Sequence, residues 1–494
     1  MFKIKKVSID NGINDYVEYF NNFFYASIIY AIIGAVLIYK HINGIGATLF
    51  IISTCIYSIY CMEASGVKIK NGSKMLIGII ILLSISSILT NDWLVIFVNF
   101  IFIFITIIVM LIYNYVSDDN WQLAEYIRSF LKTLFFSIGL LSEVFPDLED
   151  KTKHRLSHGN DTDDDNKNEF KVSYVVIGII ISIVILILVM PSLLSADYIF
   201  DEFVKNIFKL NFTDIICILI IAVFLTFSSF CGIKCLNLGE SKIEVSEKQK
   251  FNKWIGVTVF TIISIVYISF SIIQIFGLFL NKLELPHDET FSSYARNGFF
   301  QLLYVATINL IMIVVSFYAF DKSKIIKVLL SIISINTYIM LASSMYRLIL
   351  YIDSYELTKL RLYAFWGLIV VFFGLTEAVI SIYSDKFKFA KIGFVTLLTL
   401  WTILSFMRPE YIISKYNYES HITKDKPVDY NYLCTFSSDA SDIIYDLINN
   451  KMIERNLIIH NYFDKIKEKR ENNKGLNFNF SVGNSKKLES VEHD

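Results

Sequence analysis

Three side chains that could bind an ion or a polar ligand stand on one apolar run of the sequence. In SYARNGFFQLLYVATINL, residues 293–310, they are Arg296, Gln301 and Asn309. Polar groups within an apolar run indicate either a ligand path or hydrogen bonds between neighbouring helices. A helix turns by about 100° per residue, so the polar side chains of this run fall within about a third of its circumference. This first stripe consists of Asn297, Gln301, Asn309 and Ser316.

A second polar stripe is predicted on the next apolar run, at 328–350. The same helical geometry places its members in a single narrow row. They are Asn336, Ser343, Arg347, Tyr351 and Ser354. Because the two runs are consecutive, we expect the stripes to face each other or to line a shared wet crevice. Helix packing is the favoured interpretation, and a ligand path is the alternative.

Ionisable residues near these two runs collect at one end of the predicted helices. Arg296 and Arg347 would lie near the outer ends of their helices, and Asp353, Glu356 and Arg361 follow the second helix directly. Two interpretations are open. A network of structural salt bridges is favoured, and a site for an anionic ligand or a lipid headgroup is the alternative.

Glu377 stands apart from this group. Its predicted helix runs inward, so a rise of about 1.5 Å per residue places it about 20 Å below the outer surface. At that depth we do not expect it to pair with Arg347. An isolated carboxyl inside a membrane is either a proton carrier or a neutral structural group, and the second interpretation is favoured.

No catalytic, cofactor-binding or metal-binding residue is predicted. The sequence contains no HExxH, GxxxxGK[ST] or GxSxG motif. Cys231 and Cys235 would share a helix face, but no histidine or acid joins them. Asp161, Asp163 and Asp165 have the spacing of a calcium loop, but the glycine and the bidentate glutamate of that loop are missing.

The elements that would position these residues are membrane-spanning helices. Of 494 residues, 54% are hydrophobic and only 18% are charged, whereas soluble domains have about a quarter charged. The charges gather in short blocks between long apolar runs, which is typical of a polytopic membrane protein. Membrane lipids are therefore expected partners. With a net charge of −1 and no basic stripe, a nucleic-acid partner is not expected.

Eleven apolar runs are long enough to cross a bilayer, because ~30 Å of hydrocarbon requires about 20 helical residues. The predicted fold class is an all-α polytopic bundle of about eleven spans, with a range of ten to twelve. The third and fourth spans are joined only by residues 90–92, which predicts a tight helical hairpin. The runs are 21–39, 44–62, 75–91, 92–115, 171–190, 211–233, 254–281, 298–319, 328–350, 362–383 and 392–407.

Lysine and arginine are distributed unevenly between alternate loops. The set of loops that includes the N-terminus carries 23 of them, and the other set carries 7. Cytoplasmic loops carry the excess of positive charge. The pattern therefore predicts an N-terminus inside and, with eleven spans, a C-terminal tail outside. The heavy use of Ile, Lys and Asn suggests an AT-rich bacterial genome, so the predicted location is a bacterial cytoplasmic membrane.

Four regions are predicted along the chain. Residues 1–115 form an N-terminal membrane subdomain of four spans. Residues 116–170 form a cytoplasmic insert, amphipathic at first and then an acidic linker. Residues 171–407 form the main membrane domain of about seven spans, and residues 408–494 form an extracytoplasmic helical tail with a disordered end.

The tail is predicted to hold two amphipathic helices. Ser438 or Asp439 is expected to cap the first, and the second is expected at 456–471. The tail is too short to bury a large core by itself, so we expect it to lean on the membrane domain. A protein partner is expected to bind through this tail.

Four stretches resemble an uncharacterised family of bacterial multi-pass membrane proteins, domain of unknown function 4173. They are SYARNGFFQLLYVATINL, MYRLILYIDSYELTKLRLYAFWG (345–367), RPEYIISKYN (408–417) and DYNYLCTFSSDA (429–440). The resemblance covers roughly residues 170–450. Glu356 stands where the family's YGLTxLR-like stretch would have glycine. The resemblance implies a bacterial integral membrane protein and no established activity.

Three functions are compatible with these patterns. The leading hypothesis is a non-enzymatic membrane protein with a role in envelope sensing or assembly, because charged groups gather at the outer rim beside an extramembrane tail. The first alternative is a secondary transporter or channel that uses the polar stripes of the spans at 298–319 and 328–350. A weaker alternative is a membrane-embedded transferase that acts on a lipid-linked substrate.

Overall fold

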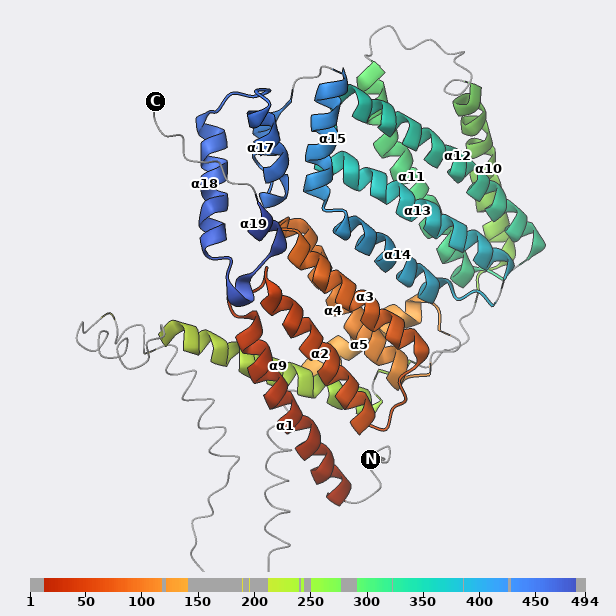
Figure 1. Ribbon diagram of the computed structural model, residues 1–494. Helices are drawn as coiled ribbons and strands as arrows, with labels where there is room; N and C mark the ends of the chain where they lie inside the picture. The colour runs from red at the N-terminus through yellow and green to blue at the C-terminus, as the bar shows by residue number, and fades with distance from the viewer. Residues whose placement is uncertain are drawn as a thin grey trace, which may run out of the picture.

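The computed structural model shows a bundle of long helices with a smaller group of helices packed against one end (Figure 1). Every element in the described part of the chain is helical, which confirms the predicted all-α class. The described residues are 13–117, 121–140, 189, 195, 212–239, 241–243, 250–276, 291–321, 323–384, 386–424 and 428–485.

Within those residues, nine helices are long and apolar enough to cross a membrane. The apolar part of α1 (Ile13–Ile38) adds a shorter one, at Asn22–Ile38. Nearly all of the expected span at 171–190 lies outside the described residues, and the predicted number of about eleven is approximate. The nine helices are α2 (Ile45–Ala64), α3 (Asn71–Leu89), α4 (Trp93–Tyr115), α9 (Phe212–Leu238), α10 (Lys253–Gln274), α11 (Phe291–Ala319), α12 (Lys324–Tyr355), α13 (Lys359–Tyr383) and α14 (Phe389–Phe406).

The predicted hairpin of α3 and α4 is present, and its turn is made by Thr90, Asn91 and Asp92. Asp92 is the N-cap of α4, where its side chain accepts a hydrogen bond of 3.0 Å from the backbone N–H of Leu94. A capping carboxylate satisfies one of the N–H groups that the first turn of a helix leaves unpaired. The cap therefore starts α4 immediately after α3 ends.

The loops of the bundle gather at two opposite ends. At one end, Asn479 contacts the α1–α2 and α3–α4 loops, and Asn417 contacts Leu357 between α12 and α13. At the other end, Lys70 bonds to Asn114 of α4. We call the first the tail end and the second the far end. The sequence predicted that successive loops lie at alternate ends of the bundle, and the loops named here do so. Their positions do not show which end faces the cytoplasm.

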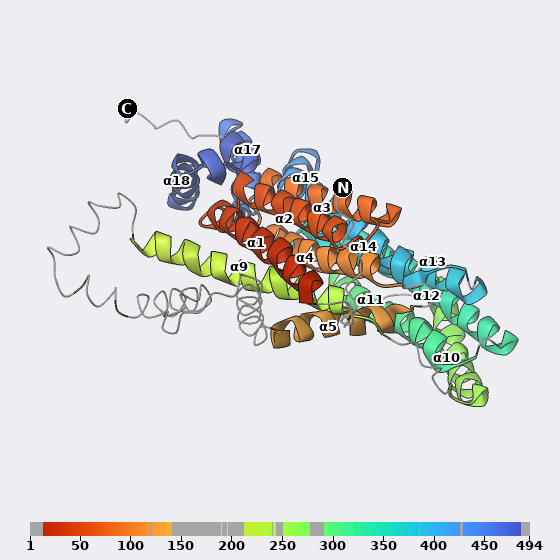
Figure 2. The same ribbon diagram turned by 90° about the horizontal axis from the view of Figure 1, so that it is seen from below.

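The predicted insert begins with a helix, α5 (Leu123–Gly139), at the far end. Ser129 and Thr133 of α5 bond to Ser241, which follows α9, at 2.7 and 2.9 Å. The backbone N–H of Leu123 donates to the hydroxyl of Tyr318 at 2.7 Å. Figure 2 shows α5 along one side of the bundle below α4 and α9. The predicted acidic linker lies outside the described residues.

The tail consists of short helices that pack on the tail end of the bundle (Figure 1). A single apolar core joins it to the spans, because Ile80 of α3, Leu398 of α14 and Ile444 of the tail belong to one buried cluster. The tail elements are α15 (Pro409–Lys424), α16 (Tyr430–Leu433), η3 (Ser438–Ala440), α17 (Ser441–Asn449), α18 (Leu457–Glu471), η4 (Gly475–Asn477) and α19 (Phe480–Asn484).

Two details of the tail differ from the sequence expectation. Neither Ser438 nor Asp439 caps α17, because the 3₁₀ turn η3 precedes it and is itself capped by Ser437. Two short helices, η4 and α19, lie within the stretch expected to be disordered, and α19 continues to Asn484. The second predicted helix, at 456–471, corresponds closely to α18, which Asn456 caps.

Candidate functional site

Asn309, a member of the first predicted stripe, lies inside the bundle. This residue of α11 is fully buried, and its amide nitrogen donates to Thr337 of α12 at 2.9 Å. Its amide oxygen accepts a hydrogen bond of 2.6 Å from the hydroxyl of Tyr267 in α10. Three spans are thus joined through one amide. This is hydrogen-bonded packing between helices, the favoured interpretation of the stripe.

The second stripe places Arg347 inside the bundle, where it is buried. Its Nη2 donates to Oε1 of Gln274 in α10 at 3.2 Å, and Ser343 donates to the same oxygen at 2.7 Å. The side chain lies directly against Gly298 of α11, where an added Cβ would coincide with Nη1. Arg347 therefore occupies the contact between α10, α11 and α12.

Three other predicted candidates on α11 and α12 have described side chains, namely Asn336, Gln301 and Asp353. Asn336 bonds to the carbonyl of Ile332 in its own helix at 2.8 Å. Gln301 and Asp353 are exposed. Arg296 lies on the first turns of α11, and its side chain falls outside the described part of the structure.

Arg361 and Glu356 are brought together where α12 ends. Nη1 of Arg361 donates to the carbonyl oxygens of Tyr355, at 2.6 Å, and of Glu356. The guanidinium also lies 4.1 Å from the ring centre of Tyr351. Glu356 has φ 66° and ψ 175°, a conformation that is otherwise almost restricted to glycine. Arg361 thus supplies donors to carbonyls that the end of α12 leaves unpaired.

Glu377 bonds to a different helix from the one that holds Arg347. This residue of α13 is buried, and its Oε1 accepts a hydrogen bond of 2.5 Å from Thr396 of α14. Its Oε2 lies 3.1 Å from the position of a Cβ added at Gly393. The carboxyl therefore joins α13 and α14. Asn309, Arg347 and Glu377 thus each bond to a different partner in the bundle.

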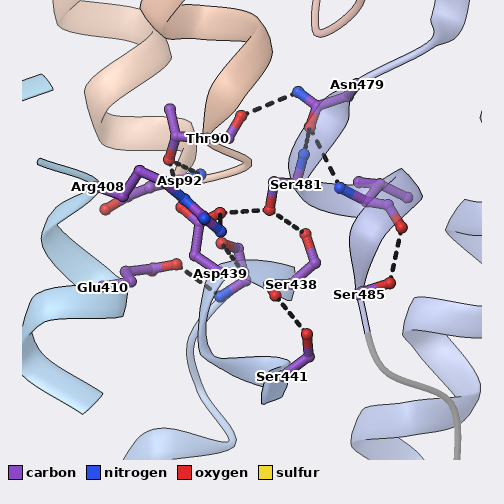
Figure 3. A network of polar contacts seen from close by, with 12 residues as sticks. Thr90, Asp92, Arg408, Glu410, Ser438, Asp439, Ser441, Asn479, Ser481 and Ser485 are labelled. Carbon is purple, nitrogen blue, oxygen red and sulfur yellow. Dashed lines mark hydrogen bonds and ion pairs between the residues drawn. The ribbon is translucent and has the colours of Figure 1, made fainter. Parts of the chain in front are cut away.

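A polar junction that the sequence did not indicate lies between the tail and the bundle (Figure 3). At its centre is Asp439, which is 1% exposed. Nη2 of Arg408 donates to Asp439 at 2.8 Å, and the hydroxyls of Thr90 and Ser481 also donate to this carboxylate. The Thr90 contact joins the α3–α4 turn to the tail. We call the charged groups Asp92, Lys359, Arg408, Glu410 and Asp439 the junction cluster.

The second half of the junction cluster surrounds Lys359, the first residue of α13. Its ammonium lies 2.5 Å from Oε1 of Glu410 and 3.6 Å from Oδ2 of Asp92. Both carboxylates are almost completely buried. The other oxygen of Glu410 accepts a hydrogen bond of 2.7 Å from the backbone N–H of Ser437. One cation is thus shared by two acids from different segments.

Asn479 fixes the chain end to the same place. Its side-chain nitrogen donates to the carbonyl oxygens of Asn43 and Thr90, both at 2.9 Å. The backbone approaches closely beside it, because a Cβ added at Gly44 would lie 2.5 Å from the carbonyl oxygen of Leu476. The tail therefore contacts the α1–α2 and α3–α4 loops with both side chain and backbone.

The electrostatics of the junction cluster are set by burial. Three carboxylates face two cations, so ionising every group leaves one negative charge in excess. Burial raises the pKa of the Glu410 carboxyl, the Asp92 carboxylate raises it further, and the Lys359 ammonium opposes both. An uncompensated charge held away from water is costly. The cluster thus favours binding of a proton.

A cavity of about 160 Å³ opens beside Arg408 and is lined by Ser438 and Ser481. These two hydroxyls are hydrogen-bonded to each other at 2.8 Å, and Ser481 reaches Asp439. Among the described residues, no three His, Cys, Asp or Glu side chains are placed to hold a metal ion. The cavity therefore borders the buried Arg408–Asp439 pair, which ties the tail to the bundle.

Comparison with known proteins places the chain in a family. Residues 77–447 match the family described as Domain of unknown function (DUF4153). The chain belongs to this family. The match spans most of the sequence and includes the whole junction cluster, whereas Asn479 lies beyond it. The more specific resemblance to domain of unknown function 4173 is not confirmed. No curated protein and no solved structure matches the chain.

Proposed function

We propose that this protein acts in envelope sensing or assembly, without catalysing a reaction, in a bacterial cytoplasmic membrane. On this proposal its N-terminus is inside and its tail, 408–494, is outside. The observation that supports the role is the junction cluster. It ties the tail to the α3–α4 turn and to the start of α13 through buried charges, so a movement of these helices changes the position of the tail.

Buried ion pairs are well suited to such coupling. They add little net stability, because removing charges from water costs about as much as their attraction returns. They do specify one arrangement over others, because a partly separated pair leaves a charge buried without its partner. A tail held in this way has two defined states, docked and released, and a signal can shift the balance between them.

The contact between α11 and α12 bears on the transporter alternative. A transport path along the polar stripes requires a continuous water-lined cavity between these helices. Asn309 instead bonds directly to Thr337, and Ser344 donates to the carbonyl of Phe299 at 2.9 Å. These contacts favour the sensing or assembly role over transport along this interface.

The proposal is tested in living cells with a photoreactive amino acid at Leu457, which is 72% exposed on the tail. The matched variants are Gly44→Val, which forces the tail away from the α1–α2 loop, and Gly78→Val, where an added Cβ meets no atom within 4 Å. We expect a defined protein adduct that changes with Gly44→Val and persists with Gly78→Val. The proposal fails if the tail forms no protein adduct, or if the adducts are the same in both variants.

A further inference from the structure

The junction cluster divides into two parts with different charge balances. Arg408 pairs with Asp439 at 2.8 Å, one cation with one acid. Lys359 serves both Asp92 and Glu410. Oδ2 of Asp92 accepts no hydrogen bond from any described residue and lies 3.6 Å from the shared ammonium. The excess negative charge therefore belongs to the Asp92–Glu410 pair.

We propose that the Asp92–Glu410 pair is a proton-operated latch, in which one shared proton holds the tail on the bundle and its loss loosens the tail. The two acids come from the α3–α4 turn and from α15, so the proton is bound across the interface that opens. When the tail is released, each carboxyl gains its own water and the need to share disappears. The latch deepens the proposed sensing role, on which its biological meaning rests.

The direction of the pH effect follows from the raised pKa of Glu410. An acid whose pKa is higher in the docked state than in the released state holds its proton more tightly when docked. Protons therefore stabilise docking at low pH, and this contribution is lost as the pH rises through the docked pKa. One linked proton changes the docking equilibrium by up to about tenfold per pH unit.

The other titratable groups around the Asp92–Glu410 pair do not account for a pH-dependent change in docking of the tail. Those facing it are Lys359 and Tyr363 of α13, Tyr432 of α16, Tyr462 of α18, and the Arg408–Asp439 pair. Lysine, arginine and tyrosine ordinarily titrate only at about pH 10 or above. Asp439 is held by a cation of its own and by two hydroxyls. Among these groups, the shared carboxyl pair is therefore the one expected to titrate between pH 5 and 8.

The test uses the full-length protein in liposomes, with Cys434→Ser and spin labels at Ile42→Cys and Leu457→Cys. Both label positions are exposed, one on the α1–α2 loop and one on the tail. Urea is added at several pH values between 5 and 8, and the distance between the labels reports release of the tail. We expect the urea concentration at half release to fall as the pH rises.

Four variants separate the latch from a general weakening. Glu410→Gln and Asp92→Asn each leave one carboxylate for one ammonium, so the midpoint should become independent of pH. Asp439→Asn should lower the midpoint at every pH and keep the pH slope. Glu419→Gln alters an exposed acid on the same helix, α15, and should behave as the parent protein.

A midpoint that stays constant from pH 5 to 8 in the parent protein would overturn the latch. Retention of the pH slope in both isosteric variants would overturn it as well. If Glu410→Gln does not fold, Asp92→Asn gives the same answer from the other side of the interface. The sensing role is tested by a different experiment, the cross-linking of the tail in cells. The latch can operate in liposomes even if the cellular adducts are the same in both glycine variants, so the two proposals can fail independently.

Discussion

The guanidinium of Arg347 occupies the space that a side chain on Gly298 would need. A Cβ added at Gly298 would coincide with Nη1 and would lie 2.9 Å from Cζ of Arg347. Arg347 is also held by Gln274 of α10. A charged side chain can thus be buried between three helices only because the residue facing it has no side chain.

Gly298→Ala should therefore destabilise the bundle. The new methyl group displaces Arg347 from Gln274, and overpacking of this kind costs about 1–3 kcal/mol. Thermal unfolding in detergent measures the loss. Gly367→Ala is the matched control on α13, since the nearest atom to its Cβ is 3.8 Å away. Equal unfolding temperatures for the two variants would contradict the packing described for Arg347.

Glu356→Gly should stabilise the protein. Glu356 adopts φ 66° and ψ 175° after α12, and a non-glycine residue in that region is strained by about 1–3 kcal/mol. Part of this gain is lost to the greater freedom of glycine in the unfolded chain, which leaves a net gain of about 1 kcal/mol. Glu356→Ala removes the carboxylate but keeps the strain, so it should bring no gain. If both variants unfold alike, backbone strain is not the cause.

Asn479→Ala should release the tail from the α1–α2 and α3–α4 loops. The substitution leaves the carbonyls of Asn43 and Thr90 without this donor, and the loss at the buried Thr90 costs about 1–3 kcal/mol. Limited proteolysis of the tail in liposomes should become several-fold faster. Asn461→Ala, at an exposed position of α18, is the control and should leave the rate unchanged.

Leu457→Cys should report the side of the tail. In intact cells a membrane-impermeant maleimide is expected to label it, because the proposed topology places the tail outside. The native Cys434 is a poor reporter, since burial raises the pKa of its thiol to about 11 and leaves little thiolate at neutral pH. Labelling only after the cells are opened would place the tail inside and reverse the proposed orientation.

The spans were predictable because their signal is local. About 20 apolar residues define each one, and the α3–α4 hairpin followed from the three residues between two such runs. Periodicity also identified Asn309 as a residue of the helix contacts. Periodicity could not show that Asn309 is buried between helices while Gln301 is exposed. A stripe that covers a third of the helix circumference is wider than the surface that contacts the neighbouring helix.

The junction cluster was not predictable because its partners are far apart in the sequence. Thr90 bonds to Asp439, and Asp92 faces Lys359. Each of these residues has an ordinary local explanation, as a turn residue, a helix cap or the first residue of a span. Their shared role depends on which helices become neighbours, which periodicity does not encode. The hairpin turn and the RPE stretch at 408–410 were visible signals, but nothing in the sequence connected them.

The pairing of Asp92 with Lys359 also constrains the order of assembly. During synthesis the α3–α4 hairpin emerges early, whereas the start of α13 and all of the tail follow much later. Until then, the Asp92 carboxylate has neither its cation nor the covering helices, and it must remain where water can reach it. The α3–α4 turn therefore acquires its buried surroundings only after the last quarter of the chain has been made, so the first hairpin is finished by the last residues to be translated.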